Sequence, residues 1–185
     1  MRTLITAALC AVIFSSSAFA GREPDGGPRL RPQDQRIKDA LREGALRSAT
    51  FRALLDRIEA GDVIVYVATN RQIKSSLSGM LTWMTQAGGY RYVRASINPD
   101  QAFDQLIATI GHEMQHAVEV IDDARVTNER TLVELYRRIG QQNSISSPSR
   151  WETSAALQTG SQVRRELSIM PGIVAVSRGV EQSQS

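Results

Sequence analysis

The only two histidines of the chain, His112 and His116, stand in the segment ATIGHEMQHAVEV, with Glu113 directly after the first. In a helix, residues four positions apart lie one above the other on one face, because a turn takes about 3.6 residues. Both imidazoles would then point toward one spot, where their nitrogens can bind Zn²⁺. Glu113 would lie about 100° around the helix and reach a water molecule rather than the metal. The HExxH pattern therefore predicts two zinc ligands and a general base.

The alternative is an ordinary amphipathic helix that happens to carry two histidines and an acid. Three features favour the metal site: the segment has a strong helical apolar pattern, the chain has no other histidine, and Gly111 and Ala117 are small enough to let another backbone come close. We therefore expect the protein to bind Zn²⁺ through His112 and His116.

A catalytic zinc site usually has three protein ligands, so a carboxylate must complete this one. Glu119 shares a helix face with His112 but lies about 10 Å further along the axis, which suits a carboxylate that orients an imidazole. The acidic residues from which the third ligand must come are Glu119, Asp122, Asp123, Glu129, Glu134, Glu152 and Glu166.

Glu152 is the expected third ligand. It opens a predicted helix, WETSAALQTGSQVRREL, whose small residues Ala155, Ala156 and Thr159 allow close packing against the histidine helix. In the alternative interpretation, Ser149 and Glu152 form a capping box, and the glutamate bonds only to the backbone. The two roles compete for one carboxylate.

The elements that must position these residues follow from the spacing of apolar residues and from turn signals. Residues 34–60 are expected to form one or two helices, and Ser48 is the candidate cap of a second one. Asn98, Pro99 and Asp100 start the histidine helix, and Gly140 ends the next helix. The expected elements are helices within 34–60, strand 63–68, a hairpin of 77–86 and 90–97 around the AGG at 87–89, and helices over 98–122, 128–139 and 151–167. The expected fold class is α+β: N-terminal helices, a small, mostly antiparallel sheet, the HExxH helix and C-terminal supporting helices.

The first twenty residues have the charge, apolar run and small-x-small ending (Ala18-Phe19-Ala20) of a signal peptide. We expect export to the periplasm or the medium, with no membrane attachment after cleavage. Cleavage would also remove Cys10, the only cysteine, so the mature protein would contain no disulfide. Residues 21–33 are expected as a flexible leader, 34–178 as a single domain and 179–185 as a disordered tail.

With HEMQH on a helix and WETSAA on a later one, the chain resembles the gluzincin branch of zinc metallopeptidases in a small, single-domain form. The resemblance covers roughly residues 60–166 and implies a zincin-like fold. It also implies His112, His116 and Glu152 as ligands, Glu113 as catalytic base, and a sheet from residues 63–97 whose edge strand holds an extended peptide.

Many gluzincins stabilise the oxyanion of the reaction with a further histidine, which this chain lacks. Tyr136, Tyr92 and Arg150 are candidate replacements, and the alternative for each is a packing or surface role. The expected function is an exported zinc metallopeptidase acting on a peptide or protein. The alternatives are a non-catalytic metal- or peptide-binding module of the same fold and a plain structural secreted protein.

Arginines supply almost all of the positive charge, which leaves a formal net charge of +3. They are interleaved with acids, as in DQRIKDALREG, and no basic block carries aromatic residues between its charges. This pattern is typical of solvated helix faces, and we expect no nucleic-acid partner. The oligomeric state does not follow from the sequence.

Overall fold

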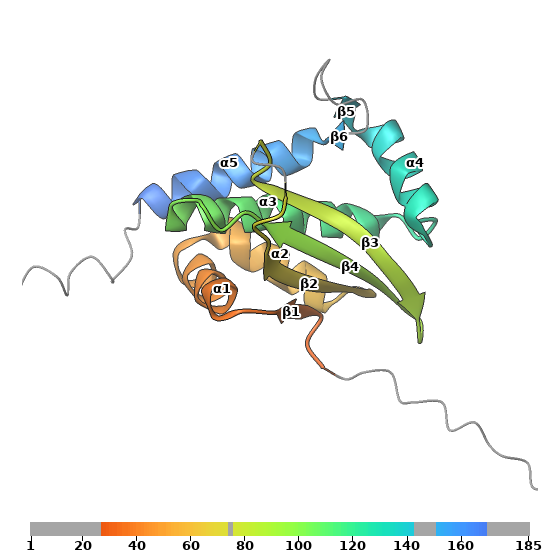
Figure 1. Ribbon diagram of the computed structural model, residues 1–185, viewed down its shortest axis with the longest axis horizontal. Helices are drawn as coiled ribbons and strands as arrows, with labels where there is room; N and C mark the ends of the chain where they lie inside the picture. The colour runs from red at the N-terminus through yellow and green to blue at the C-terminus, as the bar shows by residue number, and fades with distance from the viewer. Residues whose placement is uncertain (1–26, 74–75, 143–150, 170–185) are drawn as a thin grey trace, which may run out of the picture.

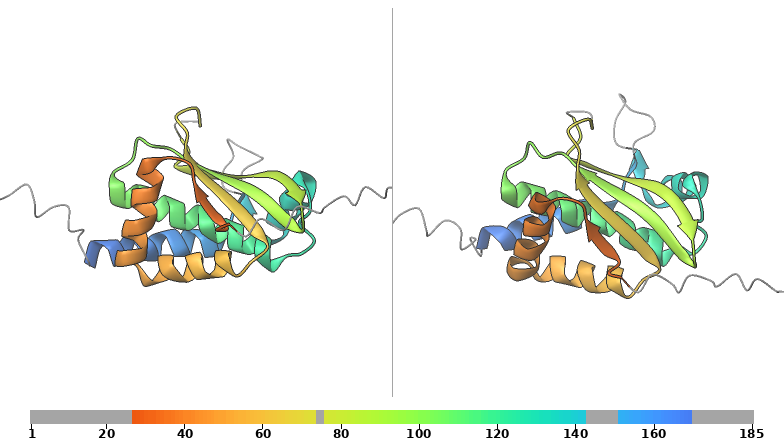
Figure 2. Two further views of the ribbon diagram at one scale, coloured as in Figure 1. Left: turned by 90° about the horizontal axis from the view of Figure 1, so that it is seen from below. Right: turned by 60° about the horizontal axis from the view of Figure 1, so that its bottom comes forward.

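The computed structural model describes residues 27–73, 76–142 and 151–169, which form a mixed α/β fold (Figure 1). Helices α1, α2, α3 and α5 gather on one face of a four-stranded sheet (Figure 2), which agrees with the expected α+β class. The helices are α1 (Gln35–Arg47), α2 (Ala49–Glu59), α3 (Phe103–Asp122), α4 (Glu129–Ile139) and α5 (Ser154–Ile169). The strands are β1 (Leu30–Pro32), β2 (Val63–Thr69), β3 (Gly79–Ala87), β4 (Tyr90–Ile97), β5 (Gln141–Gln142) and β6 (Trp151–Glu152).

The main sheet has the order β1-β2-β4-β3, and the expectation that it is mostly antiparallel is wrong. Strand β2 pairs parallel with both β1 and β4, and only the β3–β4 hairpin is antiparallel. After β2 the chain passes to the outer edge, forms β3, and then returns as β4 between β2 and β3. Strand direction is therefore set by this connection rather than by the strand sequences themselves.

The flexible leader expected over residues 21–33 is also wrong for its last part. Leu30–Pro32 pair with Val65–Val67, and the Leu30 side chain is buried in the core. The proline is tolerated because an edge strand needs ladder hydrogen bonds on one side only. The signal segment and the tail at 179–185 lie outside the described residues.

Several elements match the sequence-based expectations. The loop between β3 and β4 is Gly88-Gly89, with both residues at positive φ (58° and 80°), where glycine avoids the steric cost of a side chain. Ser48 caps α2 by accepting a hydrogen bond from the Phe51 amide, and Gly140 ends α4.

The start of the histidine helix differs from the expectation. Helix α3 begins at Phe103, with Ala102 at the N-cap position and no side-chain cap. The Asn98 side chain instead accepts a hydrogen bond from the Asp100 amide, which closes a local turn before the helix. The polar signal at 98–100 thus forms a turn rather than the first helical residues.

Helix α3 is the centre of the molecule and packs against the sheet, α2 and α5. Its expected apolar side is buried, including Ile110, Met114 and Ala117, which have no solvent exposure. These side chains belong to one core cluster that also contains residues of β2, β4, α2 and α5. No described helix combines the length and the apolar character required to cross a lipid bilayer.

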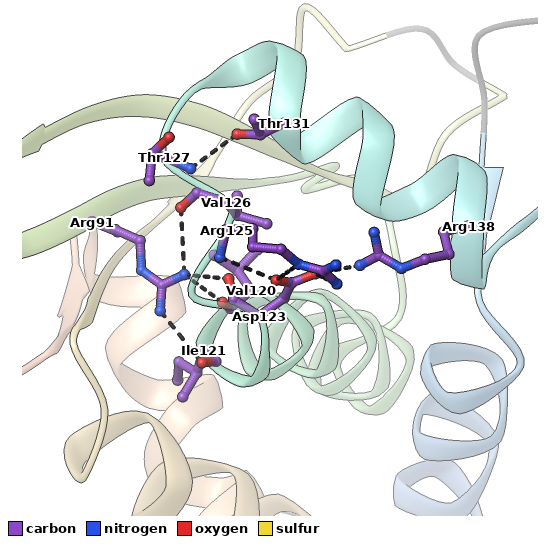
Figure 3. A network of polar contacts seen from close by, with 9 residues as sticks. All are labelled: Arg91, Val120, Ile121, Asp123, Arg125, Val126, Thr127, Thr131 and Arg138. Atoms are coloured by element: carbon purple, nitrogen blue, oxygen red, sulfur yellow. Dashed lines mark hydrogen bonds and ion pairs between the residues drawn. The ribbon is translucent and has the colours of Figure 1, made fainter.

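A buried arginine of β4 holds the C-terminal end of α3 (Figure 3). The Arg91 side chain is only 4% exposed and donates hydrogen bonds to the carbonyl oxygens of Val120 (2.6 Å) and Asp123 (2.8 Å). Its other nitrogens form a bidentate pair with Asp62, at 2.9 and 2.5 Å. The last carbonyls of a helix have no partner within it, so Arg91 fixes where α3 ends.

We expect Arg91→Met to lower the free energy of unfolding by roughly 2–4 kcal/mol, because it leaves Asp62 and the helix-end carbonyls without their charged donor. Urea denaturation of the two proteins measures the difference. Arg125→Ala removes an exposed arginine that pairs with Asp123 nearby, and it should leave stability close to that of the wild type. Equal stability of all three proteins would contradict the clamping role of Arg91.

Candidate metal centre

The two histidines lie on the same side of α3, as their spacing predicts. Their ring centroids are 4.9 Å apart and the rings are nearly perpendicular, at 81°. The His116 side chain is 7% exposed and that of His112 is 18% exposed. The pair therefore forms the floor of a site that opens to solvent on the His112 side.

Glu152 is the carboxylate that the structure brings to the two imidazoles. Its Oε2 atom lies 3.0 Å from Nε2 of His112 and 3.9 Å from Nε2 of His116. One potential ligand atom from each of the three residues lies within 4.8 Å of the others. The expected trio is thus brought together in space.

The expectation that Glu152 opens α5 is wrong. The glutamate lies in the two-residue strand β6, where it pairs with Gln141 of β5, and α5 begins at Ser154. Thr153 occupies the capping position instead, because its hydroxyl accepts a hydrogen bond from the Ala156 amide at 3.1 Å. The described residues therefore do not place Glu152 in a capping box, and Ser149 lies outside them.

Glu119 orients His116, as its position on α3 predicts. Its Oε2 atom lies 2.8 Å from Nδ1 of His116, and its other oxygen accepts a hydrogen bond from the Thr153 hydroxyl. A carboxylate only accepts hydrogen bonds, so Nδ1 carries the proton, and this contact directs Nε2 toward Glu152. The sequence gives Thr153 no clear signal, because it is an ordinary threonine near the start of the helix expected over 151–167.

Two glycines allow α3 and α5 to approach closely at this level. A Cβ atom added to Gly160 would lie 3.3 Å from the Cβ atom of His112, and one added to Gly111 would lie 3.1 Å from Val163. The role expected for Gly111 agrees with this contact. Of the small residues expected on α5, Ala156 is fully buried, whereas Ala155 is exposed.

Glu113 lies beside the trio and against the start of the edge strand β3. It is 4% exposed, and a Cβ atom added to Gly79 would lie 2.6 Å from its Oε1 atom. The glycine thus provides the space into which the carboxylate fits. Among the described residues, Glu113 does not belong to the group of three possible ligands.

The carboxylates change the protonation of their neighbours. Burial lowers the pKa of His112, but the hydrogen bond to Glu152 and the charges of Glu113, Glu152 and Glu119 outweigh burial, so the pKa is raised above 6.5. Burial raises the pKa of Tyr136 well above 10.0, and Glu119, Glu113 and Glu152 raise it further. Tyr136 is therefore a neutral phenol, and the protonated form of His112 is favoured by its acidic neighbours.

The candidate oxyanion residues are placed less favourably than the ligands. The Tyr136 ring packs edge-on against His116 at 5.2 Å, and its hydroxyl lies 3.5 Å from the His116 carbonyl oxygen. Tyr92 alternates along β4 with the buried Arg91 and Val93, so its side chain is on the opposite face of the sheet. Arg150 lies outside the described residues.

The other acids considered as third ligands take part in unrelated contacts. Asp122 pairs with Arg57, Asp123 pairs with Arg125 and Arg138, and Glu134 pairs with Arg130. Glu166 accepts hydrogen bonds from Ser48 (2.5 Å) and Thr50 (2.7 Å) beside the start of α2. Glu129 lies in the first turn of α4 and is exposed.

A cleft of about 520 Å³ runs from the trio along α3, between the start of β3 and α5. The residues at its far end, which include two arginines of α5, were not predicted from the sequence. Their signal was weak, because an exposed arginine on a helix is ordinary. The lining residues are Ser78, Gly79, Gln105, Ala108, Thr109, His112, Glu113, Glu152, Leu157, Gly160, Ser161, Arg164 and Arg165.

Comparison of the chain with protein-family models, with curated proteins and with solved structures finds no match. The interpretation of the site therefore depends on its geometry and chemistry.

Glu166 should make the stability of the protein depend on pH in the acidic range. Burial raises its pKa, but hydrogen bonds from Ser48, Gln162 and Thr50 outweigh burial and lower the pKa from 4.5 to about 2. The ionised carboxylate therefore stabilises the fold above pH 4.5, and this contribution is lost as the pH falls toward 2.

Urea denaturation of the wild type and Glu166→Gln at several pH values tests this linkage. The difference in free energy of unfolding should be largest at about pH 6 and shrink as the pH falls below the unfolded-state pKa. A difference that stays constant over this range would show that ionisation of Glu166 does not stabilise the fold.

Proposed function

We propose that the chain is an exported zinc-dependent metallopeptidase of the gluzincin-like, zincin-fold type. In this proposal His112, His116 and Glu152 hold the metal, and Glu113 is the general base. The observation that carries the proposal is the convergence of two imidazole nitrogens and one carboxylate oxygen within 4.8 Å, beside a second, buried carboxylate.

The donor set fits zinc. The ligands of a tetrahedral zinc ion, at about 2.0–2.1 Å from the metal, lie roughly 3.3 Å from one another. The distances of 3.0 and 3.9 Å from Glu152 to the two Nε2 atoms lie on either side of that value. Two imidazoles and one carboxylate are also the ligands of a known class of catalytic zinc site, which leaves a fourth position for water.

The residues around the ligands support the same assignment. Glu119 accepts a hydrogen bond from Nδ1 of His116, which is the usual way to fix the orientation of a metal-binding histidine. The hydroxyl of Thr153 in turn holds Glu119. One short segment, Glu152-Thr153, thus supplies both a ligand and the support of another ligand.

A zinc ion in this site would act as a Lewis acid toward a peptide carbonyl and lower the pKa of a water molecule to about 7. Glu113 would act as general base toward a water molecule in the cleft and then as general acid toward the amine that leaves as the peptide bond breaks. Its burial against Gly79 holds the carboxylate at the cleft.

An extended peptide is the substrate that this proposal implies. Strand β3 is an edge of the main sheet, and Gly79, its first residue, borders the cleft. A peptide that pairs with such an edge is held by main-chain hydrogen bonds and places its own backbone along the cleft.

A non-catalytic metal- or peptide-binding module is the second candidate. One observation favours it. Among the described candidates for stabilising the oxyanion, Tyr136 lies nearest to the trio. Its hydroxyl points toward the His116 carbonyl, and the residue does not line the cleft. Cleavage assays separate the two functions.

Glu152→Ala should lower zinc affinity more than about 100-fold, because it removes one of three ligands. Competition with a chromogenic chelator measures the affinity of the purified mature protein. The control is Glu134→Ala, which removes an exposed acid of α4 and should bind zinc like the wild type. Unchanged affinity in Glu152→Ala would show that the third ligand lies elsewhere, and a wild type without zinc affinity would overturn the proposed function.

Glu113→Gln should retain zinc and lose peptide cleavage by about 10²–10⁴-fold in kcat, since a general base contributes about that much. Zinc content and cleavage of a mixed peptide digest, followed by mass spectrometry, are the two measurements. Retained cleavage would contradict the role of Glu113. A wild type that binds zinc and cleaves nothing would favour the non-catalytic module.

A further inference from the structure

The cleft has two chemically different ends. One end carries the trio and Glu113, and the other carries Arg164 and Arg165 of α5. Gly160 lies against His112, and Arg164 follows four residues later, about 6 Å further along the helix axis. The positive end is therefore close to the site of the proposed reaction.

Arg164 differs from most arginines near the core, which are paired with acids. Arg47 pairs with Asp104, and Arg91 pairs with Asp62. Arg164 is exposed at the cleft and has no hydrogen bond or ion pair in the described part of the chain. An unpaired guanidinium at a cleft wall is available to a ligand.

The Arg165 guanidinium donates hydrogen bonds, but among the described residues only to a neutral side chain. Its Nε and Nη2 atoms donate to the Gln162 side chain at 3.2 and 2.5 Å. The nearest acid of α5, Glu166, accepts hydrogen bonds from Ser48 and Thr50 instead and does not line the cleft. The charge of the arginines is thus not neutralised from within α5.

The part of the cleft formed by α3 offers neutral polar groups. Thr109 donates a hydrogen bond to Gln101, and Gln105 donates one to Thr109. The Oε1 atom of Gln105 is buried and has no hydrogen-bond partner among the described residues. A buried acceptor without a partner is costly.

We propose that the Arg164–Arg165 end of the cleft binds a carboxylate of the substrate, two or three residues from the cleaved bond. This inference rests on the proposed peptidase function and gives it a substrate class: peptides with an acidic side chain, or a free C-terminal carboxylate, at that distance. A guanidinium and a carboxylate form strong, directional hydrogen bonds. The distance of two or three residues follows from the offset of about 6 Å between Gly160 and Arg164 along α5 and from the reach of the Arg164 side chain. An extended peptide covers about 3.4 Å per residue.

Matched peptide pairs test the proposal with the zinc-loaded full chain. A peptide that the wild type cleaves is first found in a mixed digest by mass spectrometry. It is then made with Glu or Gln two and three residues on either side of the cleaved bond, with both ends capped. A second pair, shortened to end at those positions, carries a free or an amidated C-terminus. These arms separate a side-chain carboxylate from a terminal one.

We expect the wild type to prefer the charged member of at least one pair by roughly fivefold or more in kcat/KM, and to lose part of this preference at high ionic strength. Arg164→Gln should bring the ratio close to one, and Arg165→Gln should lower it less. The matched control is Arg137→Gln, which removes an exposed arginine of α4 outside the cleft and should leave the ratio unchanged.

The outcomes distinguish this inference from the function beneath it. Cleavage by the wild type without preference in any pair would overturn the carboxylate site and leave the peptidase function standing. A preference that survives both Arg164→Gln and Arg165→Gln would also overturn it. A zinc-bound wild type that cleaves no peptide would overturn the peptidase function and the substrate class together.

Discussion

The short distance between α3 and α5 is the constraint on which the rest of the site depends. Helix α5 runs back along α3: Thr153 before its first turn bonds to Glu119, and Leu167 near its end shares Arg47 with Asp104. A side chain larger than hydrogen at Gly160 would press on His112. Since Glu152 lies just before α5, any separation of the helices would move its carboxylate away from the imidazoles. The geometry of the trio is therefore a consequence of helix packing.

The electrostatics of the site favour a cation. Glu113, Glu119 and Glu152 are 4%, 8% and 9% exposed, and all three act on the pKa of the same His112. Like charges that share a buried space are costly unless positive charge lies among them. Protonation of His112 supplies part of that charge when no metal is bound. A divalent ion bound by His112 in the proposed position would replace this proton and supply more positive charge. The cost of this acidic cluster is offset by interactions in other parts of the fold, namely the apolar core around α3 and the hydrogen bonds of Arg91 at the end of that helix.

Local signals in the sequence predicted local structure well. The histidine pair, the Ser48 cap and the glycine turn all depend on short-range spacing or on residue type. Glu152 was expected beside the histidines from the small residues that follow it, although it lies in β6 and not at the start of α5. Strand direction could not be predicted, because it depends on a connection that carries β3 past the position of β4. Strand β1 was missed because three residues that include a proline carry almost no strand signal. The arginine-lined end of the cleft exists only once α5 packs beside α3, so no local pattern revealed it.

The two edges of the main sheet show how the fold treats an exposed strand. Strand β1 has only three residues, and two of them are Arg31 and Pro32. A short length, a charged side chain and a proline are common protections against pairing with another chain. Strand β3 has nine residues and no charged one, and Met80 and Met84 are 40% and 39% exposed. Within the described residues its protections are a register irregularity between Trp83 and Thr85, far from Gly79 and the cleft, and the contact of α4 with the strand. A long, uncharged edge strand is normally a liability because it can pair with another chain. In our proposal the end of β3 beside Glu113 uses this property to pair with an extended peptide.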